Sequence, residues 1–232
     1  MPPTRAVVLL SGGLDSSTVL AIARSKGREV LALTVDYGQR HRREIGAAKA
    51  VAKRLGAKEH RVLRVDLAQF GGSALTDRSV AVPTGRTEEQ IGRGIPPTYV
   101  PARNTVLLSL GLAYAEAASA DEVYIAANYL DSSGYPDCRP EFFALFREVA
   151  RVGTKRGAEG RPVRIHTPLI RMTKADIVRT GAKLGVPFEL TWSCYRGGAK
   201  ACGACDSCLL RLKGFREAGL ADPLPYESPP KG

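Results

Sequence analysis

Leu9-Leu10-Ser11-Gly12-Gly13-Leu14-Asp15-Ser16-Ser17 directly follows the apolar run Ala6-Val7-Val8 near the start of this chain of 232 residues. A buried strand that ends in Ser-Gly-Gly-x-Asp-Ser and continues as a helix is typical of a loop that holds pyrophosphate. The two glycines let the backbone turn sharply and present its N–H groups, and the helix directs its positive N-terminal end to the same place. No Gly-Lys-Ser/Thr follows, so the loop is not of the Walker A type. The alternative is an ordinary glycine-rich turn, which the order of strand, motif and helix disfavours.

The loop and the first turns of its helix supply the candidate phosphate ligands. Ser11, Ser16 and Ser17 add hydroxyl donors to the backbone N–H groups. Asp15 would repel phosphate unless it holds Mg²⁺ or caps the loop. We expect the nucleotide to be bound by Leu10, Ser11, Gly12, Gly13, Leu14, Asp15, Ser16, Ser17, Thr18, Val19, Leu20 and, after the next strand, Asp36.

Strand and helix patterns alternate on both sides of this loop. Strands are predicted over 6–11, 29–36 and 59–66, and helices over 16–26 and 42–55. Farther on, helices are predicted over 104–118, 141–152, 173–180 and 207–217, with a buried strand over 123–126. This order predicts an α/β, Rossmann-like parallel sheet with helices on both faces and a ligand site beyond the carboxyl ends of the strands.

Composition limits the classes of function. The formal net charge is +11, which suits anionic ligands such as ATP, an acidic small molecule or nucleic acid. The charge is spread along the chain, and aromatic residues make up only 6% of it, so nucleic acid is not required. No apolar run approaches the roughly 20 residues that span a bilayer, and the start lacks a signal-peptide core. We therefore expect a cytoplasmic protein without a membrane partner.

Four of the five cysteines lie close together. Cys194, Cys202, Cys205 and Cys208 are spaced by 8, 3 and 3 residues. Four thiolates on short glycine-containing loops can close a tetrahedral Zn²⁺ site with no position left for water, so the metal would be structural. Free thiols, a disulfide and an iron–sulfur cluster are the alternatives.

The chain divides into three parts on this interpretation. Residues 1–190 form the nucleotide-binding α/β domain, with a mobile lid over about 70–97, where Gly and Pro are frequent and periodicity is weak. Residues 191–220 form the four-cysteine zinc-binding segment with the C-terminal helix, and 221–232 a loose Pro-rich tail.

Several further stretches resemble one family. The loop described above is similar to the PP-loop of the ATP pyrophosphatase superfamily. Asp36-Tyr37-Gly38-Gln39-Arg40-His41, the stretch from Ile95 to Asn104, Gly134-Tyr135-Pro136-Asp137-Cys138-Arg139-Pro140-Glu141-Phe142 and the four cysteines together resemble the 7-cyano-7-deazaguanine synthase family, from about residue 6 to about residue 215. The chain departs from the usual pattern at Pro97 and Ala102, where the family commonly has Asn and Gly, and in a shorter gap from Cys194 to Cys202.

The resemblance implies a reaction. The family converts 7-carboxy-7-deazaguanine, ammonia and ATP to the nitrile 7-cyano-7-deazaguanine, a precursor of queuosine. The acid is activated and captured as an amide, which is activated again and dehydrated. The resemblance also implies ATP, Mg²⁺ and a homodimer. Whether ATP yields AMP and pyrophosphate or ADP and phosphate stays open, and ammonia comes free or from a partner.

Roles follow for individual residues. Lys174 is a candidate for contacting phosphate oxygens, and Arg103 for holding a carboxylate, beside Asn104. Asp137 or Glu141 would accept hydrogen bonds from the guanine-like edge, and Arg139 would pair with the substrate acid or a neighbouring carboxylate. Each of these residues has a structural ion pair or a solvated side chain as its alternative.

Cys138 and two rival functions complete the expectations. Cys138 is favoured as a packing or substrate-contact residue over a nucleophile, because an adenylate already activates the acid. The rivals are another PP-loop enzyme that modifies tRNA, of the thiolase or lysidine-ligase type, and a zinc-stabilised nucleic-acid-binding module. The stretch 134–142 and the expected absence of a tRNA-binding extension favour the synthase over the tRNA enzymes, and the phosphate loop with the complete set of motifs disfavours the binding module.

Overall fold

A parallel sheet forms the centre of the protein. The structure, a computed structural model, describes residues 3–91, 93–130 and 134–227. Over these residues the sheet has five strands in the order β3-β2-β1-β4-β5. They are β1 (Arg5–Leu9), β2 (Glu29–Asp36), β3 (Glu59–Arg64), β4 (Glu122–Tyr124) and β5 (Arg164–His166). All neighbouring strands are parallel, which confirms the predicted fold class.

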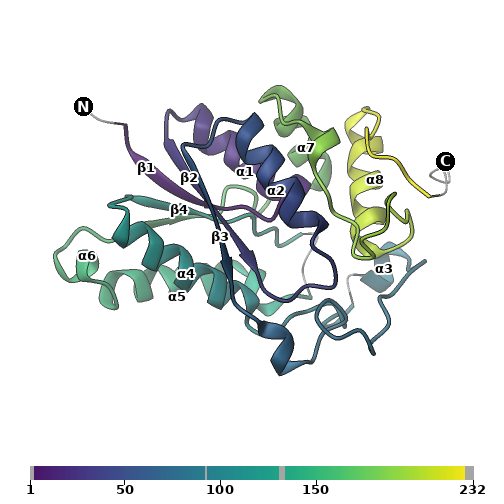
Figure 1. Ribbon diagram of the computed structural model, residues 1–232, viewed down its shortest axis with the longest axis horizontal. Helices are drawn as coiled ribbons and strands as arrows, with labels where there is room; N and C mark the ends of the chain where they lie inside the picture. Colours follow the sequence, from purple (N-terminus) through teal and green to yellow (C-terminus); the bar gives the residue numbers. More distant parts are fainter. Residues whose placement is uncertain (1–2, 92, 131–133, 228–232) are drawn as a thin grey trace.

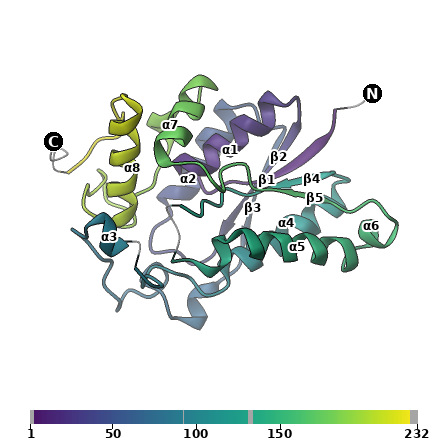
Figure 2. The same ribbon diagram turned by 180° about the vertical axis from the view of Figure 1, so that it is seen from behind.

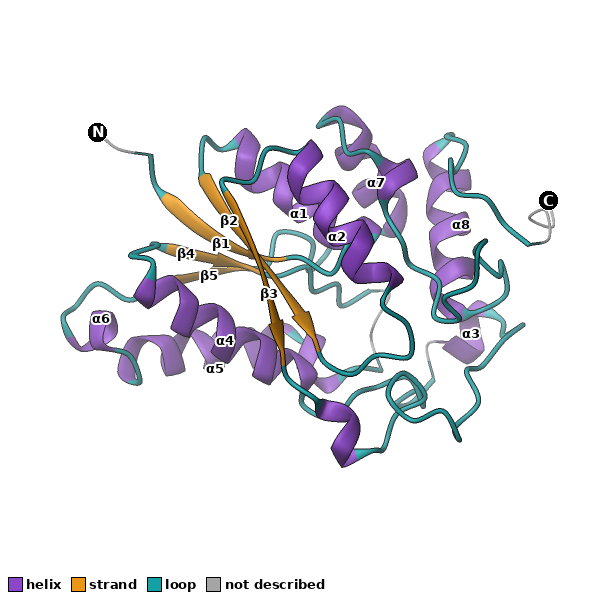
Figure 3. Cartoon of the chain, viewed as in Figure 1, coloured by secondary structure: helices purple, strands orange, loops and turns teal. Residues whose placement is uncertain are grey.

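Helices cover both faces of the sheet, as Figures 1 and 3 show. The longer ones are α1 (Leu14–Ser25), α2 (Arg43–Arg54), α4 (Arg103–Ala117), α5 (Pro140–Val152), α7 (Lys174–Lys183) and α8 (Asp206–Ala218). Short helical turns are α3 (Glu88–Ile91), α6 (Lys155–Ala158), η1 (Leu67–Phe70), η2 (Pro136–Cys138) and η3 (Phe188–Leu190). In Figure 1, α1, α2 and α7 lie above the sheet, and α4 and α5 lie below it.

Alternation along the central strands produces two hydrophobic cores. Ala6 and Val8 of β1 belong to a cluster with side chains of α1, α2 and α7. Val7 and Leu9, which point to the opposite face, pack with side chains of α4 and α5. Successive side chains of a strand point to opposite faces, so a strand buried on both sides reads as one continuous apolar run. This explains why β1 and β2 were predictable within two residues.

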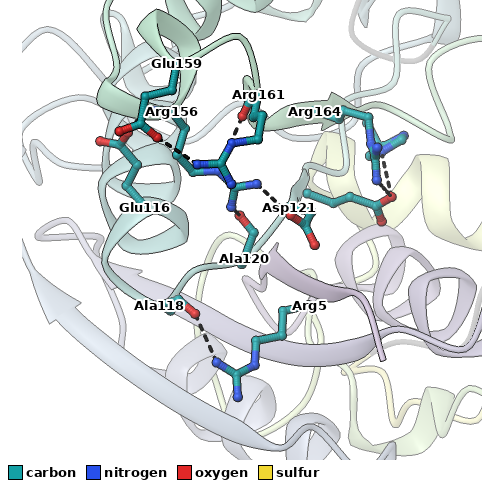
Figure 4. A network of polar contacts seen from close by, with 11 residues as sticks. Arg5, Glu116, Ala118, Ala120, Asp121, Arg156, Glu159, Arg161 and Arg164 are labelled. Atoms are coloured by element: carbon teal, nitrogen blue, oxygen red, sulfur yellow. Dashed lines mark hydrogen bonds and ion pairs between the residues drawn. The ribbon is translucent and has the colours of Figure 1, made fainter. Parts of the chain in front are cut away.

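The sheet end opposite the phosphate loop is held by charged residues, part of which Figure 4 shows. Arg156 of α6 donates to the carbonyl of Ala120 and to the carboxylate of Asp121, both at 2.6 Å. Its backbone N–H donates to Glu116 of α4 at 2.7 Å. Arg5 of β1 donates to the carbonyl of Ala118. These bonds fix the turn between α4 and β4.

The C-terminal segment shares its packing with the α/β part. Helices α7 and α8 lie side by side in both views (Figures 1 and 2). Phe215 of α8 packs edge-to-face on Phe188, with ring centroids 5.1 Å apart. Phe215 therefore belongs to the core on the α1 face of the sheet.

The described part of the tail differs from the expected loose segment. Asp222 forms a buried ion pair with Arg211 of α8, with an N–O distance of 2.7 Å. Ala201 donates to the carbonyl of Pro225, and Glu227 donates to the carbonyl of Ala201. Up to Glu227 the tail is thus bound to the cysteine-rich segment, and the rest of the predicted tail, 228–232, lies outside the described residues. The sequence did not reveal this because the backbone bonds to Ala201 join segments that α8 separates along the chain.

Candidate functional site

A cavity of about 290 Å³ opens beyond the carboxyl ends of β1 and β2. The phosphate loop, the first turn of α2, the start of α4 and the cysteine-rich segment all contribute to its lining. Parallel α/β sheets bind ligands at this edge, as the sequence predicted. The site therefore joins segments that lie as far apart in the chain as Ser11 and Arg211.

The phosphate loop is tightly constrained. Gly12 has a φ of +83°, and a side chain there would collide with the backbone of Glu44 and Ala48 in α2. Only glycine combines this backbone conformation with so close an approach. Ser16 and Ser17 donate hydrogen bonds to the carbonyl of Gly13, at 3.2 Å and 2.7 Å. The first turn of α1 is thereby held with its N-terminus at the cavity.

The predicted nucleotide residues divide into two groups. Those that line the cavity are Leu10, Ser11, Gly13, Leu14, Asp15 and Ser16. Gly12 shapes the loop from behind, whereas Ser17, Thr18, Val19 and Leu20 are buried and are not among the lining residues. Asp36 lies at the end of β2, 3.4 Å from Arg42, and is not in the lining either. Ligand contacts by both groups stay predictions.

Asp15 and Lys174 meet at the mouth of the phosphate loop. The Lys174 ammonium lies 2.9 Å and 2.8 Å from the two carboxylate oxygens of Asp15. Lys174 is the first residue of α7, and the side chain of Thr173 caps this helix in a capping box with Asp176. Asp15 and Lys174, two of the three residues predicted to be catalytic, thus meet in the lining of the cavity, and the third, Arg103, lines it as well. The pair places a cation beside the helix N-terminus while neutralising the aspartate that phosphate would otherwise meet.

Arg103 and Asn104, at the start of α4, form another part of the cavity lining. Arg103 opens α4 immediately after Ala102, which is left-handed with a φ of 52°. Its guanidinium donates to the Tyr37 hydroxyl at 3.4 Å. The side chain of Asn104 donates to the carbonyl of Asp137 at 3.0 Å. Both residues line the cavity, as a carboxylate-binding role requires.

The other predicted substrate residues lie outside the cavity. The carboxylate of Asp137 is buried and accepts a hydrogen bond from the backbone N–H of Asn104 at 3.0 Å, so it caps the start of α4. Arg139 and Glu141 are exposed and line neither described cavity. Recognition of substrate by these three residues stays a prediction. Cys138 does line the cavity, but burial raises the pKa of its thiol to about 12, which disfavours a nucleophilic thiolate.

Sequence reasoning missed an acidic residue in the cavity. Glu44, on the first turn of α2, lines it together with Tyr37 and Arg103. Burial raises the pKa of Glu44 to about 7, although the positive charge of Arg103 acts in the opposite direction. Glu44 stands three residues after the stretch Asp36–His41 that the sequence singled out, and the faces of a short helix turn are hard to assign from sequence.

The four cysteines assemble as the spacing predicted. The sulfur atoms of Cys194, Cys202, Cys205 and Cys208 all lie within 4.8 Å of one another, and all four residues are buried. Sulfur atoms of a tetrahedral zinc site lie about 3.8 Å apart, given Zn–S bonds of about 2.3 Å. Backbone N–H groups of Arg196 and Cys202 donate to the Cys194 sulfur, each at 3.4 Å. A buried sulfur that accepts N–H donors suits a metal-bound thiolate, so the cluster fits structural zinc.

The cysteine-rich segment is attached to the phosphate loop and to α2. The backbone N–H of Trp192 donates to the carbonyl of Gly12 at 2.9 Å. The guanidinium of Arg43 in α2 stacks on the Trp192 ring at 3.8 Å. The Trp192 indole donates to the carbonyl of Cys194 at 3.0 Å. A metal held by the cysteines would therefore support the nucleotide site without lining it.

The segment predicted as a lid contacts the cysteine-rich segment. Arg86 forms an ion pair with Asp206 at the start of α8, and Thr84 forms an isolated bridge with Cys205. Arg86, Asp206 and Tyr135 line a second cavity of about 100 Å³, which shares Arg103 and Cys138 with the first. The mobility of residues 70–97 stays a prediction.

No helix of the described residues is long and apolar enough to span a membrane.

Comparison with known proteins identifies close relatives of the chain. The chain is 60% identical over 228 residues to a 7-cyano-7-deazaguanine synthase from Anaeromyxobacter sp. (strain Fw109-5), covering 97% of both chains. It is 58% identical over 222 residues to the synthase of the same name from Thermosynechococcus vestitus, covering 96% and 95%.

A solved structure of NMN synthetase from Francisella tularensis matches 95% of this chain and 89% of its own chain, with a TM-score of 0.49 and 14% identity. The family model described as "Queuosine biosynthesis protein QueC" matches residues 5–219. With a match over nearly its whole length, this chain belongs to the QueC family of queuosine biosynthesis proteins.

Proposed function

We propose that this chain is the ATP-dependent enzyme that converts 7-carboxy-7-deazaguanine and ammonia to 7-cyano-7-deazaguanine. The observation that carries the proposal is one cavity lined by both the phosphate loop and Arg103, in a chain 60% identical to a synthase of that name. An enzyme that activates a carboxylate with ATP must hold two anions together, and this cavity offers cationic groups for both.

The roles follow from the lining. The α1 N-terminus, Ser11 and Ser16 bind the phosphates, and Lys174 contacts their oxygens in exchange for part of its contact with Asp15. Asp15, once released, is the carboxylate available to Mg²⁺. Arg103 holds the substrate carboxylate in a bidentate contact and keeps it near the activating phosphorus. Zinc at the cysteines contributes stability and takes no step in the reaction.

Two activations occur in sequence in this scheme. The activated acid is captured by ammonia as an amide, and the amide oxygen is activated in turn before dehydration to the nitrile. A loop that binds pyrophosphate supports release of AMP and pyrophosphate. The enzyme would act in the cytoplasm, without nucleic acid, and as a homodimer.

The test is an end-point reaction with mass spectrometry. Purified zinc-loaded protein receives Mg-ATP, ammonium and 7-carboxy-7-deazaguanine, and the nucleotide products are quantified alongside. The expected result is the nitrile, preceded by a transient amide, with AMP as the nucleotide product. Folded, zinc-loaded protein that leaves the acid untouched would overturn the substrate assignment, and turnover with tRNA and a sulfur or amine donor would favour the rival PP-loop function.

A further inference from the structure

Glu44 occupies a distinctive position in the cavity. The backbone of α2 at Glu44 lies directly against Gly12 of the phosphate loop, where a side chain on that glycine would collide with it. The Glu44 side chain points into the space that the loop shares with Arg103. The residue is thus next to both groups that would hold the reactants.

The Glu44 carboxylate also lacks a structural partner. Among the described residues, no hydrogen bond or ion pair engages its side chain, although its charge interacts with Arg103 of α4. The other groups that face it are Tyr37, after β2, and Cys194 in the cysteine-rich segment. Burial without a partner raises the pKa of Glu44 to about 7, near the operating range of a proton-transfer group.

Other ionisable residues of the cavity are poorly suited to accept a proton. Burial raises the pKa of Cys138 to about 12 and lowers the pKa of His41. His41 also packs against Gly197 of the cysteine-rich segment. Asp15 is paired with Lys174. Of the described lining residues, Glu44 alone combines a carboxylate, proximity to both Gly12 and Arg103, and no structural partner.

We propose that the Glu44 carboxylate is the proton acceptor in amide formation and in dehydration to the nitrile. The assignment rests on the proposed function. When ammonia attacks, its lone pair forms the C–N bond, the activated C–O bond breaks and its electron pair leaves with the phosphate group. One N–H proton then passes to Glu44, which yields the neutral amide.

Dehydration needs two further proton transfers. Activation of the amide oxygen by the second ATP gives a cationic imidate, which loses one N–H proton. As the C–O bond breaks, the remaining N–H bond supplies the electron pair of the nitrile, and its proton leaves. Glu44 accepts each proton and returns it to solvent between steps, so no other co-reactant is required.

The test compares Glu44→Gln with wild type and with Glu189→Gln, an exposed residue on η3 that serves as the charge-matched control. Glutamine keeps the shape of the side chain but cannot accept the proton. We expect Glu44→Gln to bind ATP with unchanged affinity and to catalyse acid-dependent exchange of pyrophosphate into ATP. Its rates of amide and nitrile formation should fall on the order of 10²-fold or more. For conversion of the amide to the nitrile, a step that consumes no ammonia, the wild-type and Glu189→Gln rates should fall below a pH of about 7, and Glu44→Gln should lose that limb.

The outcomes separate the two proposals. Nitrile from wild type supports the proposed function, whatever the variant does. With an active wild type, a Glu44→Gln enzyme that keeps its rate and its acid limb overturns the role of Glu44. If Glu44→Gln loses pyrophosphate exchange and ammonia capture equally, and its rate still falls at acid pH, the role of Glu44 is also overturned. That pattern indicates a positioning role. Inactive wild type removes the proposed function and this assignment with it.

Discussion

At the scale of single residues, the ionised Glu44 side chain lowers the stability of the folded protein. A carboxyl group whose pKa rises from 4.5 to about 7 on folding favours the folded state while protonated. That contribution is present below the unfolded pKa and is lost as the pH rises through about 7. At pH 8 the folded protein therefore carries a desolvated carboxylate without a partner.

Replacing Glu44 should consequently stabilise the protein at alkaline pH. We expect Glu44→Gln to raise the free energy of unfolding by about 1–2 kcal/mol at pH 8, a value reduced from the full shift because the side chain keeps some contact with water. At pH 4 the gain should vanish. Denaturant unfolding at both pH values measures this, and a variant less stable than wild type at pH 8 would contradict the half-buried, unpaired carboxylate.

Ala102 offers an independent residue-scale prediction. It is exposed and left-handed, with a φ of 52°, which costs an alanine roughly 1–2 kcal/mol relative to glycine. Glycine loses part of that advantage through the entropy of the unfolded chain. Ala102→Gly should raise the free energy of unfolding by up to about 1 kcal/mol.

The matched control is Ala117→Gly, near the end of the same helix α4. There the backbone is helical, so glycine should lower the stability by about 0.5–1 kcal/mol. Urea denaturation of both variants gives the comparison. If the two substitutions change stability in the same direction, the left-handed conformation of Ala102 is wrong.

At the scale of elements, the phosphate loop depends on the cysteine-rich segment. Trp192 donates to the Gly12 carbonyl and stacks under Arg43 of α2. Chelation of the metal under reducing conditions should release one zinc per chain, lower the melting temperature and weaken ATP binding.

Elemental analysis, thermal melting and ATP titration of chelated and re-zincated protein measure the three effects. Re-addition of zinc should restore all of them. Iron with visible absorption would identify a cluster instead of zinc. Metal-free protein with unchanged ATP affinity would show that the link through Trp192 does not support the loop.

The elements also show how far sequence reasoning reaches. β1, β2 and the four-cysteine cluster were predictable because each depends on a local pattern: continuous apolar runs or fixed cysteine spacing. β5 was missed, because three residues that include Arg164 and His166 carry no strand pattern. β5 is a strand because it pairs with β4, and no local sequence pattern indicates that pairing.

The same limit explains the candidate site. Asp15 and Lys174 were both predicted, but their direct contact spans 159 positions of the chain. The cap that Asp137 provides for α4 was not predictable, because α4 begins 34 residues earlier and nothing local indicates the contact. Glu44 was missed because its importance comes from burial without a partner, a property of the assembled cavity. The sequence shows which residue stands at each position, whereas the desolvation of a side chain depends on the neighbours that the fold brings to it.

At the scale of the whole molecule, the carboxylates at the two ends of the sheet have different partners. Near the cavity, Glu44 is unpartnered among the described residues. At the opposite end, Glu122 of β4 is almost fully buried and accepts hydrogen bonds from Arg28 at 2.8 Å and Arg164 at 2.8 Å. Burial alone would raise the pKa of Glu122, but the two arginines reverse this and lower it to about 2. Arg28, β4 and β5 are thereby joined at this end of the sheet.

Glu122 should therefore determine acid stability without affecting turnover. Its folded pKa of about 2 lies below the ordinary value of 4.5, so its contribution is complete above about pH 4.5 and is lost as the pH falls toward 2. Glu122→Gln leaves two arginines without their carboxylate and should cost about 2–4 kcal/mol at pH 7. The difference from wild type should shrink steadily between pH 4.5 and 2, as followed by denaturant unfolding. Because the cavity lies at the other end of the strands, the folded variant should keep wild-type kcat and KM at pH 8. A changed KM would mean that the two ends of the sheet are coupled, which the separate contacts of Glu122 and Glu44 do not provide.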